Sequence, residues 1–441
     1  MKKAISIGIQ GFSALREQDC FFVDKTNFIK EWWENRDVVT LITRPRRFGK
    51  TLNMSMLECF FSNKYANRAD LFEGLSIWQE EAYRKLQGSY PVIFLSFAAV
   101  KAGNLEDAKT QIKQEIARLY RENRNLMKED IFGEDERELY YQTTVKMDDV
   151  TAQDSLRNLS EWMERYYGKK VIILLDEYDT PMQEAYVQGY WDEFTAFVRS
   201  LFNASFKTNP YLERAIMTGI TRVSKESIFS DLNNLQVITT TSDLYADCFG
   251  FTESEVFHVL DEFGMGDKKD EVKQWYDGFT FGEHKDIYNP WSITNYLDKR
   301  KTYPYWASTS SNGLVSRLIR TASADVKEKM EDLLNGREIV VSFDEQIVYN
   351  QLDHNENAIW SLLLASGYLK VKHVDYRGIT REPWYTLDIT NIETLSMFTT
   401  MFQDWFQNQD ANYGYFMKAL INGDLEAMNY YMNKVALATF S

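Results

Sequence analysis

The sequence predicts an α/β protein built around a parallel sheet, and three observations support this. Apolar runs of strand length alternate with amphipathic, helix-length segments through the first half of the chain. The run at residues 171–175 is continuously apolar, as a strand covered on both faces requires. A loop ending in Gly-Lys-Thr follows the first run and precedes a helical stretch. We therefore expect a three-layer core, with helices on both faces of the sheet.

Five apolar runs are expected to form the strands: residues 38–43, 90–97, 171–175, 215–218 and 237–240. Apolar residues at spacings of three and four predict the helices between them. These helices are residues 52–61, 105–119, 156–167 and 191–202. Asn104 is the expected N-cap of the second helix, and Gly168 is the expected end of the third.

The chain is expected to divide into three parts, since 441 residues correspond to about three domains of roughly 150 residues. The sheet core would span residues 1–250, with a helical insertion at about 100–168. A helical lid would follow at 251–335, and a small α/β region at 336–441. Residues 359–371 predict a helix, a turn and a strand, which is either half of a winged-helix unit or, as we favour, plain hydrophobic core.

Composition excludes several classes of protein. A hydrophobic fraction of 44% and a charged fraction of 26% indicate a folded chain. The net charge of −15 excludes a broadly basic protein that coats nucleic acid. Three separated cysteines and four scattered histidines argue against a zinc centre or a histidine-based site. The N-terminus carries no signal-peptide pattern and no run reaches about 18 apolar residues, so we expect a cytoplasmic protein without membrane spans.

The strongest functional signal is the sequence Thr-Arg-Pro-Arg-Arg-Phe-Gly-Lys-Thr at residues 43–51. In a phosphate-binding loop, GxxxxGK[ST], backbone N–H groups hold phosphates, the lysine reaches the β/γ oxygens and the hydroxyl binds Mg²⁺. Lys50 and Thr51 match this pattern, but Arg44 replaces the first glycine. Because Pro45 fixes its own φ and favours extended backbone at Arg44, we expect a reshaped loop start and a conventional end.

The arginines of this loop add positive charge to an acidic chain, which indicates an anion site. The N-terminus of the following helix adds its dipole and its free N–H groups. The alternative is a surface loop with a chance Gly-Lys-Thr. The predicted nucleotide-binding residues are Arg44, Arg46, Arg47, Phe48, Gly49, Lys50, Thr51 and Leu52.

Two acids at the end of a buried strand give the second signal. Asp176 and Glu177 directly follow the apolar run at 171–175. In P-loop ATPases an acid at this position holds Mg²⁺, so we predict Thr51 and Asp176 as metal ligands. The next carboxylate can orient or deprotonate the attacking water, which predicts a catalytic role for Glu177. The alternative, a strand ending in solvated acids, loses weight because both signals occur in the right order.

The end of the next strand gives a third, weaker signal. Thr218 could contact the γ-phosphate or the water, and Arg222 could stabilise developing charge in cis or across a subunit interface. A structural threonine and a structural arginine are an equal alternative.

These residues resemble the AAA-ATPase-like family of bacteria, whose members often carry a C-terminal PD-(D/E)xK nuclease-type domain. The resemblance rests on residues 22–26, 44–51, 174–179, 219–222, 275–279 and 288–292. It implies a P-loop core with a lid that binds ATP with Mg²⁺ through Lys50, Thr51 and Asp176. It also implies that Glu177 is the hydrolytic carboxylate and that Thr218 is a strand-end sensor. Arginine at position 44 is then a feature of the family.

The nuclease is the one point of departure from the resemblance. A nuclease domain would begin at about residues 413–441, where this sequence stops. Two near matches to its motif, at 271–273 and 325–327, lie in polar helical sequence and do not qualify. We therefore expect no nuclease activity.

Three interpretations of function follow. The first is an ATPase that switches conformation through its lid. The second is a nucleotide-binding regulatory or interaction module with negligible turnover. The third is an interaction protein that recruits a partner through its C-terminal segment. A protein partner or a homo-oligomer is compatible with all three, whereas nucleic-acid binding lacks the basic face it needs.

Overall fold

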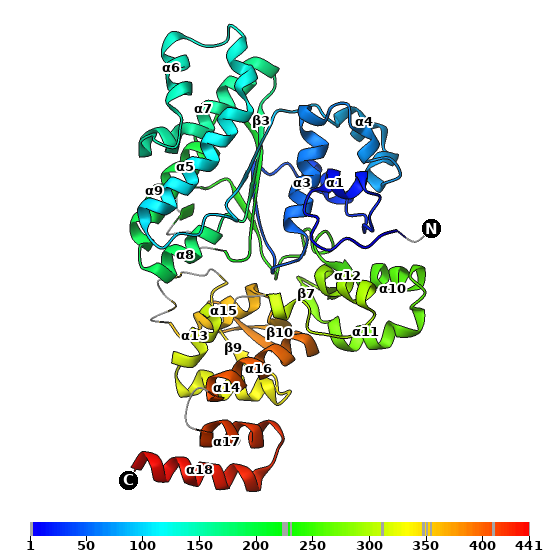
Figure 1. Ribbon diagram of the computed structural model, residues 1–441, viewed down its shortest axis with the longest axis vertical. Helices are drawn as coiled ribbons and strands as arrows, with labels where there is room; N and C mark the ends of the chain where they lie inside the picture. The colour runs from blue at the N-terminus through cyan, green and yellow to red at the C-terminus, as the bar shows by residue number, and fades with distance from the viewer. Residues whose placement is uncertain are drawn as a thin grey trace.

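The core of the computed structural model is a five-stranded sheet with strand order β2-β3-β4-β1-β5, and every strand pair in it is parallel (Figure 1). The structure describes residues 3–222, 228–229, 232–309, 313–345, 349, 352, 355–407 and 411–440. The strands are β1 (Val39–Thr43), β2 (Val92–Ser96), β3 (Val171–Asp176), β4 (Leu212–Gly219) and β5 (Leu235–Ile238). All five predicted strands are present. The fifth ends before Thr239, whose amide donates to the Ser242 hydroxyl in a turn (3.0 Å).

Helices cover both faces of the sheet, as predicted (Figure 1). One face carries α5 (Leu105–Glu122), α7 (Asp149–Tyr167) and α9 (Trp191–Phe202), with α6 (Glu134–Gln142) and α8 (Thr180–Gln188) beside them. The other face carries α1 (Phe12–Glu17), α2 (Asn27–Asn35), α3 (Lys50–Phe61) and α4 (Glu81–Leu86). Strand side chains alternate between two cores: Leu41 packs on the first face and Ile42 on the second. Asn104 caps α5, and Gly168 ends α7 with a left-handed φ of 68°.

The part that follows the core contains both helices and a small sheet. Its elements are β6 (Phe251–Thr252), α10 (Glu253–Glu262), α11 (Lys269–Tyr276), β7 (Phe279–Phe281), β8 (His284–Tyr288) and α12 (Pro290–Lys299). The three strands form an antiparallel sheet of order β6-β8-β7. The expected helical lid therefore also contains a small sheet, whose strands are too short to leave an alternating pattern in the sequence. Residues 271–273 lie in α11, as expected.

Two further helices, α13 (Gly313–Thr321) and α14 (Ala324–Leu334), precede the last part of the chain, and residues 325–327 lie in the second of them. A sheet of order β10-β11-β9 follows, built from β9 (Ile339–Val341), β10 (Leu369–Arg377) and β11 (Glu382–Ile389). Helix α15 (Ala358–Ala365), Gly367 and β10 confirm the predicted helix, turn and strand. Helices α16 (Ile392–Gln407), α17 (Ala411–Ile421) and α18 (Leu425–Phe440) complete this part. Residues 413–440 thus lie in α17 and α18, while Ser441 lies outside the described residues.

We propose a division into a core (1–250), a lid (251–335) and a C-terminal unit (336–441). In Figure 1 the lid and the C-terminal unit lie at one end of the core sheet. All five strands run in the same direction, and the C-terminal unit contacts loops that follow β1, β4 and β5, so this end holds the carboxyl ends of the strands. Among the described helices, none is long and apolar enough to cross a membrane.

The C-terminal unit contacts loops that follow three of the core strands. Glu345 accepts hydrogen bonds from the Thr239 and Thr241 hydroxyls after β5 (2.9 and 2.7 Å). The hydroxyls of Tyr349 and of Thr221, after β4, lie 3.0 Å apart. Gly367 packs on Pro45, after β1: a Cβ atom at Gly367 would lie 2.7 Å from Pro45 Cγ. The loops that border the site are therefore covered by the C-terminal unit.

We expect Gly367→Ala to destabilise the protein more than Gly336→Ala. Both glycines have left-handed φ angles, 82° and 74°, but a Cβ atom at Gly336 meets nothing within 4 Å. The strained backbone alone costs about 1 kcal/mol. The clash with Pro45 raises the cost at Gly367 to about 3 kcal/mol. Urea unfolding of both variants measures this difference, and equal losses would show that Gly367 is not packed as described.

Glu393 is a buried carboxyl group that joins the C-terminal unit to the lid. It lies in the first turn of α16 and accepts hydrogen bonds from the Ser292 hydroxyl (2.8 Å) and the Trp306 amide (2.6 Å). Burial raises the pKa of Glu393 to about 7, against 4.5 for an ordinary glutamate, and its hydrogen bonds oppose this only in part. Folding therefore favours the protonated form. The protonated Glu393 carboxyl therefore stabilises the folded protein fully below pH 4.5, and this contribution to the free energy of unfolding is lost as the pH rises through 7.

We expect Glu393→Gln to gain stability relative to the wild type by about 2 kcal/mol between pH 5.5 and pH 8. Glutamine keeps an acceptor oxygen for the two donors and carries no charge to bury. Unfolding free energies at the two pH values measure the gain. Glu328→Gln, at an exposed position of α14, is the control and should show no such trend. A difference in unfolding free energy between Glu393→Gln and the wild type that does not change with pH would contradict the raised pKa of Glu393.

Candidate functional site

A cavity of about 490 Å³ lies at the carboxyl ends of the core strands, where the predicted site residues were expected. Its volume is in the range of small-molecule sites. The loop at 46–53 forms one wall, and Asp176 and Glu177 lie beyond it. The N-terminal segments 6–10 and 21–23, with Trp291 of the lid, supply mainly apolar side chains. The cavity thus joins core and lid.

The loop between β1 and α3 has the backbone of an anion site. Two of its residues are left-handed, Arg47 (φ 66°) and Gly49 (φ 83°), and α3 begins at Lys50. The backbone N–H groups of residues 49–52 donate to no other described residue. Such free donors at the start of a twelve-residue helix are suited to bind phosphate oxygens.

Four polar side chains of the prediction meet beside this loop. The Thr51 hydroxyl donates to Asp176 Oδ2 (2.7 Å), and the Thr218 hydroxyl donates to Asp176 Oδ1 (2.5 Å). The buried Lys50 amine donates to the carbonyls of residues 44 and 45 (both 3.1 Å). Burial, followed by the charge of Glu177, raises the pKa of Asp176. A cation at this carboxylate would offset that burial, so the donor set fits a hard metal ion.

Glu177 combines an unusual backbone with a charged contact. Its φ is 53°, a left-handed value that a non-glycine residue adopts at a cost of about 1 kcal/mol. Its carboxylate lies 3.7 Å from Lys50 Nζ and accepts a hydrogen bond from Thr180 (3.4 Å). Strained residues of this kind cluster at functional sites.

Arg44 corrects the prediction, because its side chain does not enter the cavity. The guanidinium is fully buried and donates to the carbonyls of Thr43 (3.0 Å) and Thr239 (2.7 Å). It lies over the Phe281 ring, 4.5 Å from the centroid. Burial lowers the pKa of Arg44 to about 9, so the side chain is charged at neutral pH. Arg44 therefore holds the start of the loop in place.

Thr218 and Arg222 stand at the end of β4 and after it, as predicted, but their side chains do not line the cavity. Thr218 is fully buried, and its hydroxyl holds Asp176 from behind. Neither residue is among those that line the cavity. Arg222 is half-buried and forms no ion pair with any described residue. The end of a predicted strand indicates where Thr218 and Arg222 lie in the fold, but it does not indicate in which direction their side chains point.

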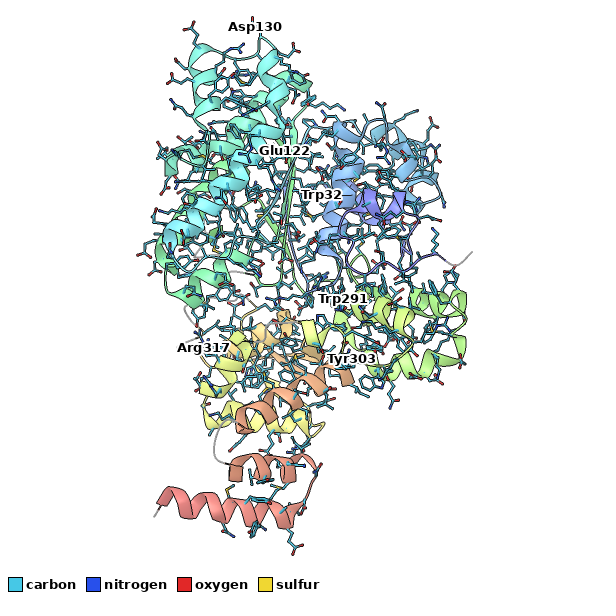
Figure 2. The ribbon with its side chains drawn as sticks, in the orientation of Figure 1. Trp32, Glu122, Asp130, Trp291, Tyr303 and Arg317 are labelled. Atoms are coloured by element: carbon cyan, nitrogen blue, oxygen red, sulfur yellow. The ribbon has the colours of Figure 1, made fainter. Side chains whose placement is uncertain are left out.

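The other predicted residues border the cavity, each in a different way. Arg46, Arg47, Phe48 and Leu52 all contribute to its wall. Arg47 is exposed, and its guanidinium lies 4.3 Å from the centroid of Trp291. Figure 2 shows Trp291 where the lid meets the core. The Phe48 ring is buried against the lid strands.

Two features of the site were missed by sequence reasoning. The fully buried carboxylate of Asp179 accepts hydrogen bonds from the Ile220 and Thr221 amides (2.9 and 2.7 Å) and so fixes the loop after β4. Burial raises its pKa, with a further contribution from Glu177. The sequence signal that could have identified Asp179 was its position in the motif at residues 174–179. The second feature that was missed is Asn289 of the lid, whose side-chain nitrogen donates to the Arg46 carbonyl. Of the four histidines, three are exposed and His354 lies outside the described residues.

The fold and this site define an AAA-like P-loop core. The chain matches the model of the AAA-ATPase-like family, described as "Predicted AAA-ATPase", over residues 6–229. It belongs to this family, whose description indicates ATP binding. The chain is also 27% identical over 398 residues to the "Uncharacterized protein in vnfD 5'region" of Azotobacter chroococcum mcd 1, covering 89% of this chain and 68% of that relative.

We expect Arg44→Lys to destabilise the protein by about 2 kcal/mol, because an ammonium group cannot reproduce the fork of the guanidinium and leaves buried carbonyls unpaired. Arg46→Lys, at a half-buried position of the same loop, should cost less than about 0.5 kcal/mol. Urea unfolding compares the two variants. An Arg44→Lys protein as stable as the wild type would contradict the structural role of Arg44.

Proposed function

We propose that this protein binds Mg²⁺·ATP in the cavity and hydrolyses it, using the cycle to move the lid relative to the core. The proposal rests chiefly on the hydrogen bond between Thr51 Oγ1 and Asp176 Oδ2 (2.7 Å), beside the free N–H groups at the start of α3. These oxygens come from two elements far apart in sequence and meet where P-loop proteins hold their metal ion. Family membership supports the same assignment.

Each part of the cavity suits one part of the nucleotide. The N–H groups of residues 49–52 and the Lys50 amine would bind the β- and γ-phosphates. The apolar segments 6–10 and 21–23 would contact the base, and Arg46 and Arg47 would add positive charge at the phosphates. Thr51 and Asp176 would hold the metal ion, which supplies charge neutralisation at the phosphates.

Hydrolysis would depend on Glu177. Its carboxylate lies in the cavity wall, beside Lys50 and Thr180. Displacement of Lys50 toward a phosphate would free this carboxylate to orient a water molecule and accept its proton. Thr218 would act indirectly by fixing the orientation of Asp176. Arg222 lies outside the cavity wall, so a role for it would require a partner subunit or a movement of its loop.

A nucleotide-binding module with negligible turnover is the second candidate. It is favoured by the ion pair of Glu177 with Lys50 and by the placement of Thr218 and Arg222 outside the cavity wall. In this case nucleotide would hold the lid and core together without being consumed. The two candidates agree on binding and differ only in turnover.

We expect Glu177→Gln to bind Mg²⁺·ATP within threefold of the wild type and to release phosphate at least about 100-fold more slowly, since glutamine cannot accept the proton. Phosphate release and equilibrium ATP binding on both proteins measure this. Turnover in the wild type that Glu177→Gln abolishes would establish the ATPase. Tight binding without turnover in either protein would favour the second candidate.

Two further variants serve as controls. Glu184→Gln removes a carboxylate from the same cavity wall and should leave turnover unchanged. Lys50→Ala removes the buried amine and should abolish binding. Normal binding and turnover by Lys50→Ala would show that the site is wrongly assigned.

A further inference from the structure

The phosphate-binding loop is held from outside by the lid at three consecutive residues. The Arg46 carbonyl accepts a hydrogen bond from Asn289 Nδ2 (3.3 Å). The Arg47 guanidinium lies over Trp291. The Phe48 ring lies 4.7 and 5.4 Å from the rings of Phe279 and Phe281, measured between centroids. All of these partners lie between residues 279 and 291, in β7 and at the start of α12.

The loop sequence explains why such support is needed. A loop that begins with glycine can adopt its turn without steric cost. Here the loop begins with Arg44 and Pro45, and Arg47 occupies the left-handed region (φ 66°) without being a glycine. A conformation of this kind persists only where surrounding contacts stabilise it. The lid supplies these contacts at residues 46–48.

Asn289 is the polar member of this set and is fully buried. Its side-chain oxygen caps α12 by accepting from the amides of Trp291 (2.9 Å) and Ser292 (3.3 Å). Its side-chain nitrogen donates to the Arg46 carbonyl. One side chain therefore starts the lid helix and fixes the carbonyl direction in the loop. Turning that peptide would turn the Arg47 N–H with it and would disturb the loop directly before the free N–H groups of residues 49–52.

We propose that Asn289 is a positioning residue through which the lid controls the phosphate-binding loop, so that tight binding of the phosphates requires a docked lid. This inference rests on the proposed function and adds its regulation. Contact with the lid would stabilise the binding conformation of the loop, and bound phosphates would stabilise the docked lid to the same degree, because such coupling is reciprocal.

The test compares Asn289→Ser with Asn295→Ser. Serine at 289 remains a good N-cap for α12 but is too short to reach the loop. Asn295 is equally buried in α12, and its amide donates to the Trp291 carbonyl within the same helix (2.8 Å). The probes are Mg²⁺·ATP and Mg²⁺·tripolyphosphate, which has no base. Thermal unfolding confirms that each variant is folded at the assay temperature.

We expect Asn289→Ser to weaken binding of both probes about tenfold, as loss of one buried hydrogen bond implies, while Asn295→Ser changes either by less than twofold. Weaker ATP binding with unchanged tripolyphosphate binding would place the effect at the base and overturn the inference. Equal losses in both variants, no loss in Asn289→Ser, or wild-type binding of ATP without tripolyphosphate would also overturn it. A wild type that binds neither probe would instead refute the proposed function.

Discussion

The architecture of the site depends on one buried charge, the guanidinium of Arg44. A buried cation must be compensated, and here backbone carbonyls from the ends of β1 and β5 do so. The same residue donates its amide to the Gly219 carbonyl at the end of β4 (3.1 Å) and offers its own carbonyl to Lys50. Arg44 thus ties three strand ends to the lysine of the loop. Arginine in place of the first glycine weakens the sequence match to a standard phosphate-binding loop, yet this arginine is the residue that orders the loop here.

The cavity is lined by groups of three kinds, each from a different part of the chain. Apolar residues come from the N-terminal segments, arginines and free N–H groups come from the loop at residues 46–52, and Asp176 and Glu177 come from the end of β3. The core, lid and C-terminal unit all contact the loops between them. Changes in ligand at the centre can therefore reach all three parts through direct packing.

The sequence was sufficient to predict what depends on local pattern. The strands, the major helices, the caps at Asn104 and Gly168 and the approach of Thr51 to Asp176 follow from periodicity and from the parallel sheet. It did not reveal where side chains point: Arg44, predicted to bind nucleotide, is buried under the start of the loop, and the Thr218 hydroxyl is turned toward Asp176. The short lid strands were missed because they leave no alternating pattern, and the role of Asn289 was missed because its partner, the Arg46 carbonyl, is far away in the chain.

The contact between Pro45 and Gly367 constrains how the sequence can change over evolution. The pyrrolidine ring occupies the space that a side chain at position 367 would need, so glycine must be kept at 367 while Pro45 is kept. Losing the ring at 45 would relieve this clash but would leave the left-handed φ of 82° and the Phe279 ring 3.0 Å from an added Cβ atom. Selection on the C-terminal unit and selection on the loop are therefore linked, and a C-terminal unit transplanted from a relative would need glycine here to fit a loop that keeps Pro45.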